Sequence, residues 1–295
     1  MPKLKATWNT LQHLIRHEAH HEQPFGPLKR FVGWQIFKRA NNEPITINAF
    51  DGGRLHCYPG TSASNAVIYY RWPDWSEMQL LRKMLRPGDG FLDIGANVGV
   101  YSVLASTLVG PDGPVHAFEP DPMNADKLRA NFELNDLPVD NVHQVAVGEE
   151  SGTRRFANNR GSIGSLLPDD APNGIDVICT KLDDIISAPI SSYVAKVDVE
   201  GFELGVMKGA TDLLESKSIK VMILETNDCC RYAGETRKEL QQFLGAFGYS
   251  LFKIDVSHDL IRFDPIILGG SYPDNSVALC DSDWVKERLP GVLIN

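Results

Sequence analysis

The sequence predicts an α/β protein with a Rossmann-like, mainly parallel sheet that carries helices on both faces. Two observations predict it. From residue 76 onward, short apolar segments alternate with helical ones, and the first apolar segment runs into a glycine-rich turn. The 295-residue chain is 43% hydrophobic and 23% charged, an ordinary globular composition that excludes a disordered or collagen-like chain.

The first 60 residues follow a different pattern. Apolar residues at helical spacing predict an amphipathic helix over 4–21, and a second helix begins after Pro27. Alternating residues on either side of a Gly-Gly turn then predict a β-hairpin over 45–58. We therefore expect a small helical and hairpin N-terminal extension over 1–60, followed by the main domain over 61–295.

In the main domain the elements can be assigned in order. A helix over 76–85 precedes an apolar strand at 91–94, and a helix over 98–108 precedes a strand at 115–118. The remaining predicted elements are a helix at 121–134, strands at 142–147, 193–199, 219–225, 249–254 and 276–280, and helices near 203–215 and 235–247. This alternation implies a mainly parallel sheet, in which ligands bind at the carboxyl ends of the strands.

Charge and hydropathy exclude several classes of protein. The net charge is −9, whereas a nucleic-acid binder would show the opposite balance. The sequence has neither an apolar run of 18 residues nor a signal peptide, so we expect a cytoplasmic protein. The basic, aromatic stretch over 28–39 has two interpretations: peripheral contact with a membrane or a partner subunit, or packing on the main domain.

The glycine-rich turn is the strongest functional signal. The strand at 91–94 runs into Gly95 and Gly99 and then into a helix. Glycine lets the backbone approach a ligand closely, and the helix start offers free N–H donors. Glu119 lies 20 residues beyond Gly99 at the end of the second strand, where a carboxylate can accept ribose hydroxyls.

The details of this turn favour one class of cofactor. A dinucleotide site requires G-x-G-x-x-G, but Asn97 occupies the position of the second glycine, which admits the pyrophosphate. Asp93 suits a cofactor with a cationic amino group, and S-adenosylmethionine (SAM) has one and no phosphate. The candidate SAM-binding residues are Asp93, Gly95, Asn97, Gly99 and Glu119. An NAD-dependent sugar oxidoreductase and a fold that has lost its chemistry remain the alternatives.

Several segments together resemble the FkbM family of SAM-dependent methyltransferases. They are Pro87–Asp89, Leu92–Gly99, Phe118–Pro120, Leu182–Asp184 and Lys196–Glu203, and the resemblance extends over about 77–255. It implies the class I methyltransferase fold, SAM binding at the five residues above, and a central role for Asp198 and Glu200. Members of the family typically methylate hydroxyl groups, often on the sugars of surface glycans or on secondary metabolites.

The chemistry of such a reaction singles out three carboxylates. An alcohol becomes a good nucleophile when a positioned base removes its proton. Asp198 and Glu200, at the end of the strand at 193–199, are candidates for that base. Asp198 has a second interpretation, in which it orients the methionine amino group or caps the next helix. In the class I fold the next strand would bring Glu225 beside Asp198, and these oxygens could instead hold Mg²⁺.

The sequence therefore predicts a SAM-dependent methyltransferase that O-methylates a sugar hydroxyl of a glycan or glycolipid precursor, or a hydroxyl of a secondary metabolite. The acceptor is thus a small molecule or a glycan, and no nucleic acid is expected.

Overall fold

The computed structural model describes residues 26–157, 164–167, 174–187, 190, 192–227, 236–257 and 260–294. The helix predicted over 4–21 lies outside these described residues.

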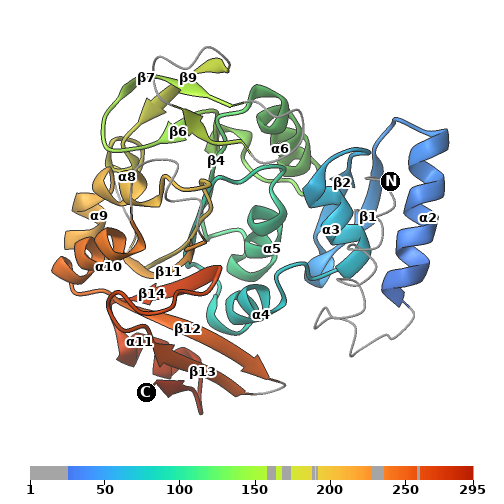
Figure 1. Cartoon of the computed structure of the whole chain (residues 1–295). Coiled ribbons are helices and arrows are strands. Elements are labelled where there is room, and N and C mark those ends of the chain that lie inside the picture. Colours follow the sequence, from blue (N-terminus) through green and yellow to red (C-terminus); the bar gives the residue numbers. More distant parts are fainter. Residues whose placement is uncertain are drawn as a thin grey trace.

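A nine-stranded sheet forms the centre of the molecule, in the order β15-β13-β12-β14-β11-β10-β3-β4-β5 (Figure 1). Five neighbouring strands are parallel: β3 (Gly90–Ile94), β4 (Val115–Phe118), β5 (Val142–His143), β10 (Tyr193–Val197) and β11 (Ile219–Glu225). Every residue of β3 and β10 is buried, which explains their almost continuous apolar sequence. From β3 the chain proceeds first to β4 and β5 on one side and later to β10 and β11 on the other, so the strand order reverses between β3 and β10.

The other part of this sheet is largely antiparallel. It contains β12 (Ser250–Ser257), β13 (Leu260–Pro265), β14 (Asn275–Leu279) and β15 (Leu293–Ile294). The β14 strand is antiparallel to both β11 and β12, and β15 pairs in parallel with β13. The predicted mainly parallel sheet is thus confirmed, with an antiparallel extension at one edge.

Helices cover both faces of the sheet, as predicted. On one face lie α4 (Trp75–Met84), α5 (Val100–Val109), α6 (Pro122–Leu134) and α11 (Ser282–Arg288). On the other lie α7 (Leu182–Ile185), α8 (Glu203–Lys208), α9 (Thr211–Glu215) and α10 (Arg237–Ala246). The single helix expected near 203–215 is two helices, because the chain bends at Gly209, where a Cβ would overlap the backbone oxygen of Gly148.

A second, four-stranded sheet was not predicted. It has the order β6-β9-β7-β8 and contains β6 (Ala146–Val147), β7 (Gly152–Phe156), β8 (Leu166–Leu167) and β9 (Ile175–Thr180). The strand predicted over 142–147 is therefore two strands, β5 and β6, that belong to different sheets. Short 3-10 helices complete the assignment at Phe50–Gly52 and Val139–Asn141.

The N-terminal part has the predicted helix and hairpin and one further helix. They are α2 (Gly26–Ala40), β1 (Ile45–Asn48), β2 (Arg54–Cys57) and α3 (Ser62–Tyr70). The indole N–H of Trp34 on α2 donates to Asn65 Oδ1 on α3 at 2.6 Å. In Figure 1, α2, α3 and the hairpin lie to the right of α5, on the side away from α8 and α9. None of the helices in the described part of the chain combines the length and hydropathy needed to cross a bilayer.

Candidate active site

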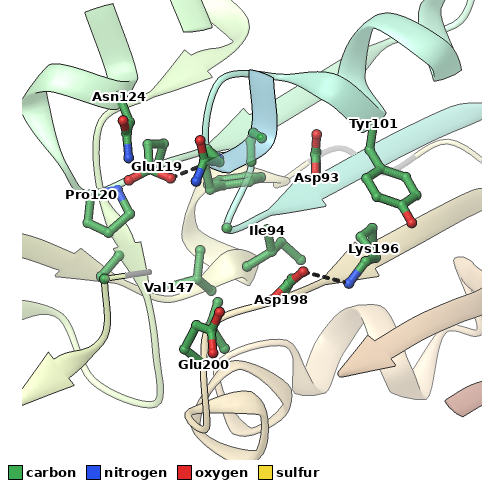
Figure 2. A pocket seen from close by; sticks show the side chains of 18 of the residues that line it. Asp93, Ile94, Tyr101, Glu119, Pro120, Asn124, Val147, Lys196, Asp198 and Glu200 are labelled. Carbon is green, nitrogen blue, oxygen red and sulfur yellow. Dashed lines mark hydrogen bonds and ion pairs between the residues drawn. The ribbon is translucent and has the colours of Figure 1, made fainter. Parts of the chain in front are cut away.

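A cavity of about 310 Å³ opens at the carboxyl ends of β3, β4 and β10, where the strand order reverses (Figure 2). Six of the residues singled out from the sequence line it: Asp93, Gly95, Asn97, Glu119, Asp198 and Glu200. Gly99 and Glu225 are not among its lining residues. The motifs from three separate strands thus meet at one site.

The two glycines of the turn are explained by packing within the protein. Both have a φ of 85°, a left-handed backbone conformation that favours glycine. A Cβ on Gly95 would overlap the backbone oxygen of Asp198, and a Cβ on Gly99 would lie 2.6 Å from Cδ1 of Leu128 on α6. Packing within the protein thus accounts for both glycines, and close approach of a ligand to this turn stays a prediction. They allow the β3 turn to approach the end of β10, and α5 to approach α6.

Glu119 supports the same turn from the neighbouring strand. Its side chain accepts hydrogen bonds from the backbone N–H groups of Asn97 and Asp121, both at 2.8 Å. Asn97 has a left-handed φ of 53°, which asparagine tolerates better than most residues. Glu119 is 5% exposed, and burial raises its pKa to about 7. Each of its oxygens accepts one of these two bonds and has capacity for a second.

Asp93 at the end of β3 also lines the cavity. It is 2% exposed, and the Ser102 hydroxyl on α5 donates to its carboxylate at 2.5 Å. Burial raises the pKa of Asp93 to about 6. The cavity is therefore lined by two buried carboxyl groups whose pKa values lie close to neutral pH.

Lys196 was not singled out on its own from the sequence, yet it is central to the site. It is 2% exposed within β10, and its Nζ donates to Asp198 Oδ2 at 2.9 Å. Burial works to raise the pKa of Asp198, but the charge and hydrogen bond of Lys196 hold it below its ordinary value. A lysine inside the apolar strand YVAKV is the signal that could have identified this residue, because a buried cation requires a counter-ion.

Glu200 and Glu225 complete an acidic cluster with Asp198. Each of the three offers a carboxylate oxygen, and these oxygens lie within 4.8 Å of one another. Glu200 is held in a left-handed conformation (φ 54°), in a turn where Gly201 donates its N–H to buried Glu203 at 3.1 Å. Burial first, and then the charges of Asp198 and Glu200, raise the pKa of Glu225 to about 9. Glu225 therefore carries a proton at neutral pH, and Asp198 is ionised.

One wall of the cavity comes from residues that were not singled out from the sequence. Ser62, Ala63 and Ala66 on α3 line it, together with Asp74 at the start of α4. The Tyr101 hydroxyl donates to Asp74 Oδ2 at 2.9 Å, and Lys196 Nζ lies 5.6 Å from the centroid of the Tyr101 ring. These contacts join residues far apart in sequence, so no local motif predicts them.

Comparison with known proteins identifies the family. The family model described as the methyltransferase FkbM domain matches residues 93–251, more than half of the chain. The chain belongs to the FkbM methyltransferase family. It is thus a SAM-dependent methyltransferase with an α/β fold of class I, as the sequence predicted.

Two curated relatives and one solved structure illustrate the similarity. The chain is 30% identical over 185 residues to 31-O-demethyl-FK506 methyltransferase FkbM of Streptomyces tacrolimicus, covering 51% of this chain and 70% of that protein. It is 28% identical over 169 residues to hexuronic acid methyltransferase AglP of Haloferax volcanii, covering 57% and 66%. The crystal structure of methyltransferase FkbM from Methylobacillus flagellatus KT matches with a TM-score of 0.43 and 14% identity, covering 86% of this chain and 60% of that one.

Proposed function

We propose that this protein transfers the methyl group of SAM to a hydroxyl of a sugar in a glycan or glycolipid precursor, or of a secondary metabolite. The observation that carries the proposal is the ion pair of Asp198 with buried Lys196 at 2.9 Å, on the wall of the cavity that the Gly95 turn and Glu119 also line. The names of two relatives support it, since one acts on an O-demethylated compound and the other on a hexuronic acid.

The described residues fit SAM. The cofactor is cationic at its sulfonium and amino groups, and the cavity is lined mainly by apolar groups and carboxylates, with Lys196 already paired. Asp93 would face the amino group, and Glu119 would accept hydrogen bonds from the ribose hydroxyls. Asn97 would hold the turn between them. When bound, SAM would supply a methyl group attached to its sulfonium sulfur. The methyl group would pass to the acceptor, and the sulfur would keep the electron pair of the broken C–S bond.

The role proposed for Asp198 is that of the general base. The acceptor oxygen forms its bond to the methyl carbon, and its proton passes to the Asp198 carboxylate. Lys196 favours this role because it keeps Asp198 ionised before the reaction. Glu225 is protonated at neutral pH and therefore serves as a hydrogen-bond donor, while Glu200 lines the cavity beside Asp198.

A bound Mg²⁺ is the alternative version of the same site. Carboxylate oxygens are the ligands that Mg²⁺ prefers, and those of Asp198, Glu200 and Glu225 converge within 4.8 Å. A cation there would lower the pKa of an acceptor hydroxyl. The two versions separate experimentally: the metal version predicts loss of activity in EDTA and recovery with Mg²⁺, and the bare base predicts neither.

Asp198→Asn tests the role of the base. The change keeps the shape and removes the charge, so turnover should fall by about 10²–10⁴-fold, the usual contribution of general acid–base catalysis. The affinity for SAM should change by less than about tenfold, because binding of the cofactor is not what is lost. The assay follows transfer of ¹³C-methyl from labelled SAM to simple glycosides by mass spectrometry, and calorimetry measures SAM binding.

Asp176→Asn is the matched control, because it removes a carboxylate from an ion pair with Arg155 on the second sheet, outside the cavity lining. It should behave as wild type. If Asp198→Asn instead lost SAM affinity in proportion to turnover, Asp198 would be a cofactor anchor, and Glu200 would become the candidate base.

Thermal-shift measurements test the two alternative functions, a binding protein without catalytic activity and an NAD-dependent sugar oxidoreductase. A cofactor that binds only the folded state raises the melting temperature. A binding protein that has lost its chemistry predicts a shift with SAM and no methyl transfer to any acceptor. An NAD-dependent oxidoreductase predicts a shift with NAD.

We also propose the division of the chain into an extension over 1–60 and a methyltransferase domain over 61–295. For the stretch over 28–39, exposed Leu28, Val32 and Ile36 support contact with a membrane or a partner subunit, while buried Phe31 and Trp34 account for packing on α3.

A further inference from the structure

Among its described residues, the segment before the family match contributes one charged group to the cavity. The family model begins at residue 93, but residues 62–74 form part of the cavity wall. Ser62, Ala63 and Ala66 on α3 have short side chains that leave room for a ligand. Asp74 is the charged group among these lining residues.

Asp74 does not perform the structural task that its position suggests. It is the N-cap of α4, where an aspartate normally accepts a hydrogen bond from the first-turn backbone N–H groups, but its side chain makes no capping bond. Asp121 at the N-cap of α6 does cap, accepting from the N–H of Met123 at 2.8 Å. Asp74 Oδ2 instead accepts from the Tyr101 hydroxyl at 2.9 Å, and its Oδ1 accepts no hydrogen bond from the described residues.

The charges around Asp74 indicate the chemistry of its ligand. Among the described residues that line the cavity, Lys196 is the one cation, and its ammonium is already paired with Asp198. Asp74 also lies near this cation, because the Tyr101 hydroxyl that donates to Asp74 belongs to the ring whose centroid is 5.6 Å from Lys196 Nζ. The negative charges of Asp198, Asp74 and Glu225 all raise the pKa of Lys196. An anionic group of an acceptor placed here would be repelled by these carboxylates and by Glu200. A hydroxyl group would donate a hydrogen bond to them.

We propose that Asp74 is a specificity-determining residue that binds a second hydroxyl of the acceptor, next to the hydroxyl whose proton Asp198 takes. The acceptor is then an uncharged polyhydroxylated compound, such as a neutral sugar, and not a uronic acid or a phosphorylated group at this subsite. This inference rests on the proposed function. It separates the chain from the relative whose name specifies a hexuronic acid.

The test uses matched pairs of glycosides as probes: the methyl glycosides of glucose, galactose and mannose, and those of the corresponding uronic acids. Each pair differs only in CH₂OH against carboxylate. Wild type should favour the neutral member. Asp74→Asn should lower kcat/KM for the neutral glycoside at least about tenfold, mainly by raising KM. The ratio of kcat/KM for the uronate to kcat/KM for its neutral partner should therefore rise at least about tenfold. SAM affinity should stay within about twofold.

A merely structural role for Asp74 would lower both members of a pair alike and leave the ratio unchanged, which would overturn the proposal. A wild-type preference for the uronates would also overturn it. Asp51→Asn is the matched control, because Asp51 forms an ion pair with Arg82 outside the cavity, and it should leave the ratio unchanged.

The same assays distinguish failure of the proposed sugar acceptor from failure of the proposed role of Asp74. If wild type binds SAM and methylates none of the glycosides, the proposed sugar acceptor is wrong and the role of Asp74 falls with it. If wild type methylates them and Asp74→Asn has the same ratio, only the role of Asp74 is wrong.

Discussion

At the scale of single residues, burial decides the charge of Asp93 and Glu119, the two carboxyl groups proposed to bind SAM. Glu119 is 5% exposed and Asp93 2% exposed, and loss of hydration raises their pKa values to about 7 and about 6. In the free protein both carry protons for part of the time near neutral pH. A ligand that donates hydrogen bonds or brings positive charge favours the ionised forms, and therefore lowers both pKa values on binding.

SAM affinity should consequently rise with pH. Below about pH 6 both groups must lose protons before they can hold the cofactor, and each such proton costs about tenfold in affinity per pH unit. Binding should therefore strengthen between about pH 5.5 and pH 8 and release protons, and the number released should fall as the pH rises through the pKa of Asp93 at about 6 and that of Glu119 at about 7. Calorimetry in two buffers of different ionisation enthalpy measures the released protons directly.

The control for this pH dependence is Glu119→Gln, which cannot ionise and should release fewer protons at pH 7. An affinity that is constant from pH 5.5 to pH 8, with no proton released, would show that neither carboxyl group holds the cofactor.

Site residues that lie close together in the sequence can be predicted from it, whereas residues that only the fold brings together cannot. Asp93, Gly95 and Asn97 are consecutive or nearly so, and a strand followed by a turn brings them to one place. Lys196 and Asp198 also belong to one strand end. The bond between Tyr101 and Asp74 spans 27 residues and joins α5 to the start of α4, so only the packed fold brings it into the cavity.

At the scale of elements, the turn after β3 is held by backbone contact between two strands. The N–H of Asp198 donates to the Ile94 carbonyl at 2.9 Å, and the Asp198 oxygen fills the space that a Cβ on Gly95 would need. The turn and the strand end that bears the candidate base are therefore one structural unit. A side chain at position 95 would disturb both.

Gly95→Ala should destabilise the protein even without a ligand. The left-handed φ costs an alanine about 1–2 kcal/mol, and the overlap with Asp198 adds about 1–3 kcal/mol of overpacking. Gly88→Ala is the matched control, because Gly88 has a φ of 87° with nothing within 4 Å of the added Cβ. It should show the backbone cost alone. Urea unfolding of the two variants gives the difference.

This comparison can also contradict the structural explanation. If Gly95→Ala were as stable as Gly88→Ala and yet failed to bind SAM, the ligand would be what needs the space at residue 95.

Sequence periodicity predicts the buried strands of the central sheet but not the strands of the second sheet. Buried strands such as β3 and β10 are recognisable because all their residues are apolar or paired. The second sheet has no such signal. Four of the five residues of β7, GTRRF, are exposed or half-buried, and β8 is only two residues long. The strands β6 and β7 form because they pair with β9, and β8 forms because it pairs with β7. No local sequence pattern predicts these pairings.

At the scale of the whole molecule, the hydrophobic core extends well beyond the family match. The family model covers residues 93–251, but one cluster of buried side chains runs from Phe31 on α2 to Leu289 after α11. The hairpin is part of it: Leu55 is 1% exposed, and the His56 N–H donates to Asn131 Oδ1 on α6 at 2.8 Å. The N-terminal extension therefore shares its core with the methyltransferase domain.

Leu55→Ala tests whether the two parts unfold together. Removal of a buried leucine side chain should lower the free energy of unfolding by about 2–5 kcal/mol. If residues 26–60 and the domain form one cooperative unit, tryptophan fluorescence and loss of SAM binding should shift to lower urea together. Ile267→Ala, at a side chain that is 80% exposed, should change the free energy by less than about 0.5 kcal/mol. Were the boundary at residue 60 also a folding boundary, Leu55→Ala would shift an early transition of the extension and leave the urea concentration at which SAM binding is lost unchanged.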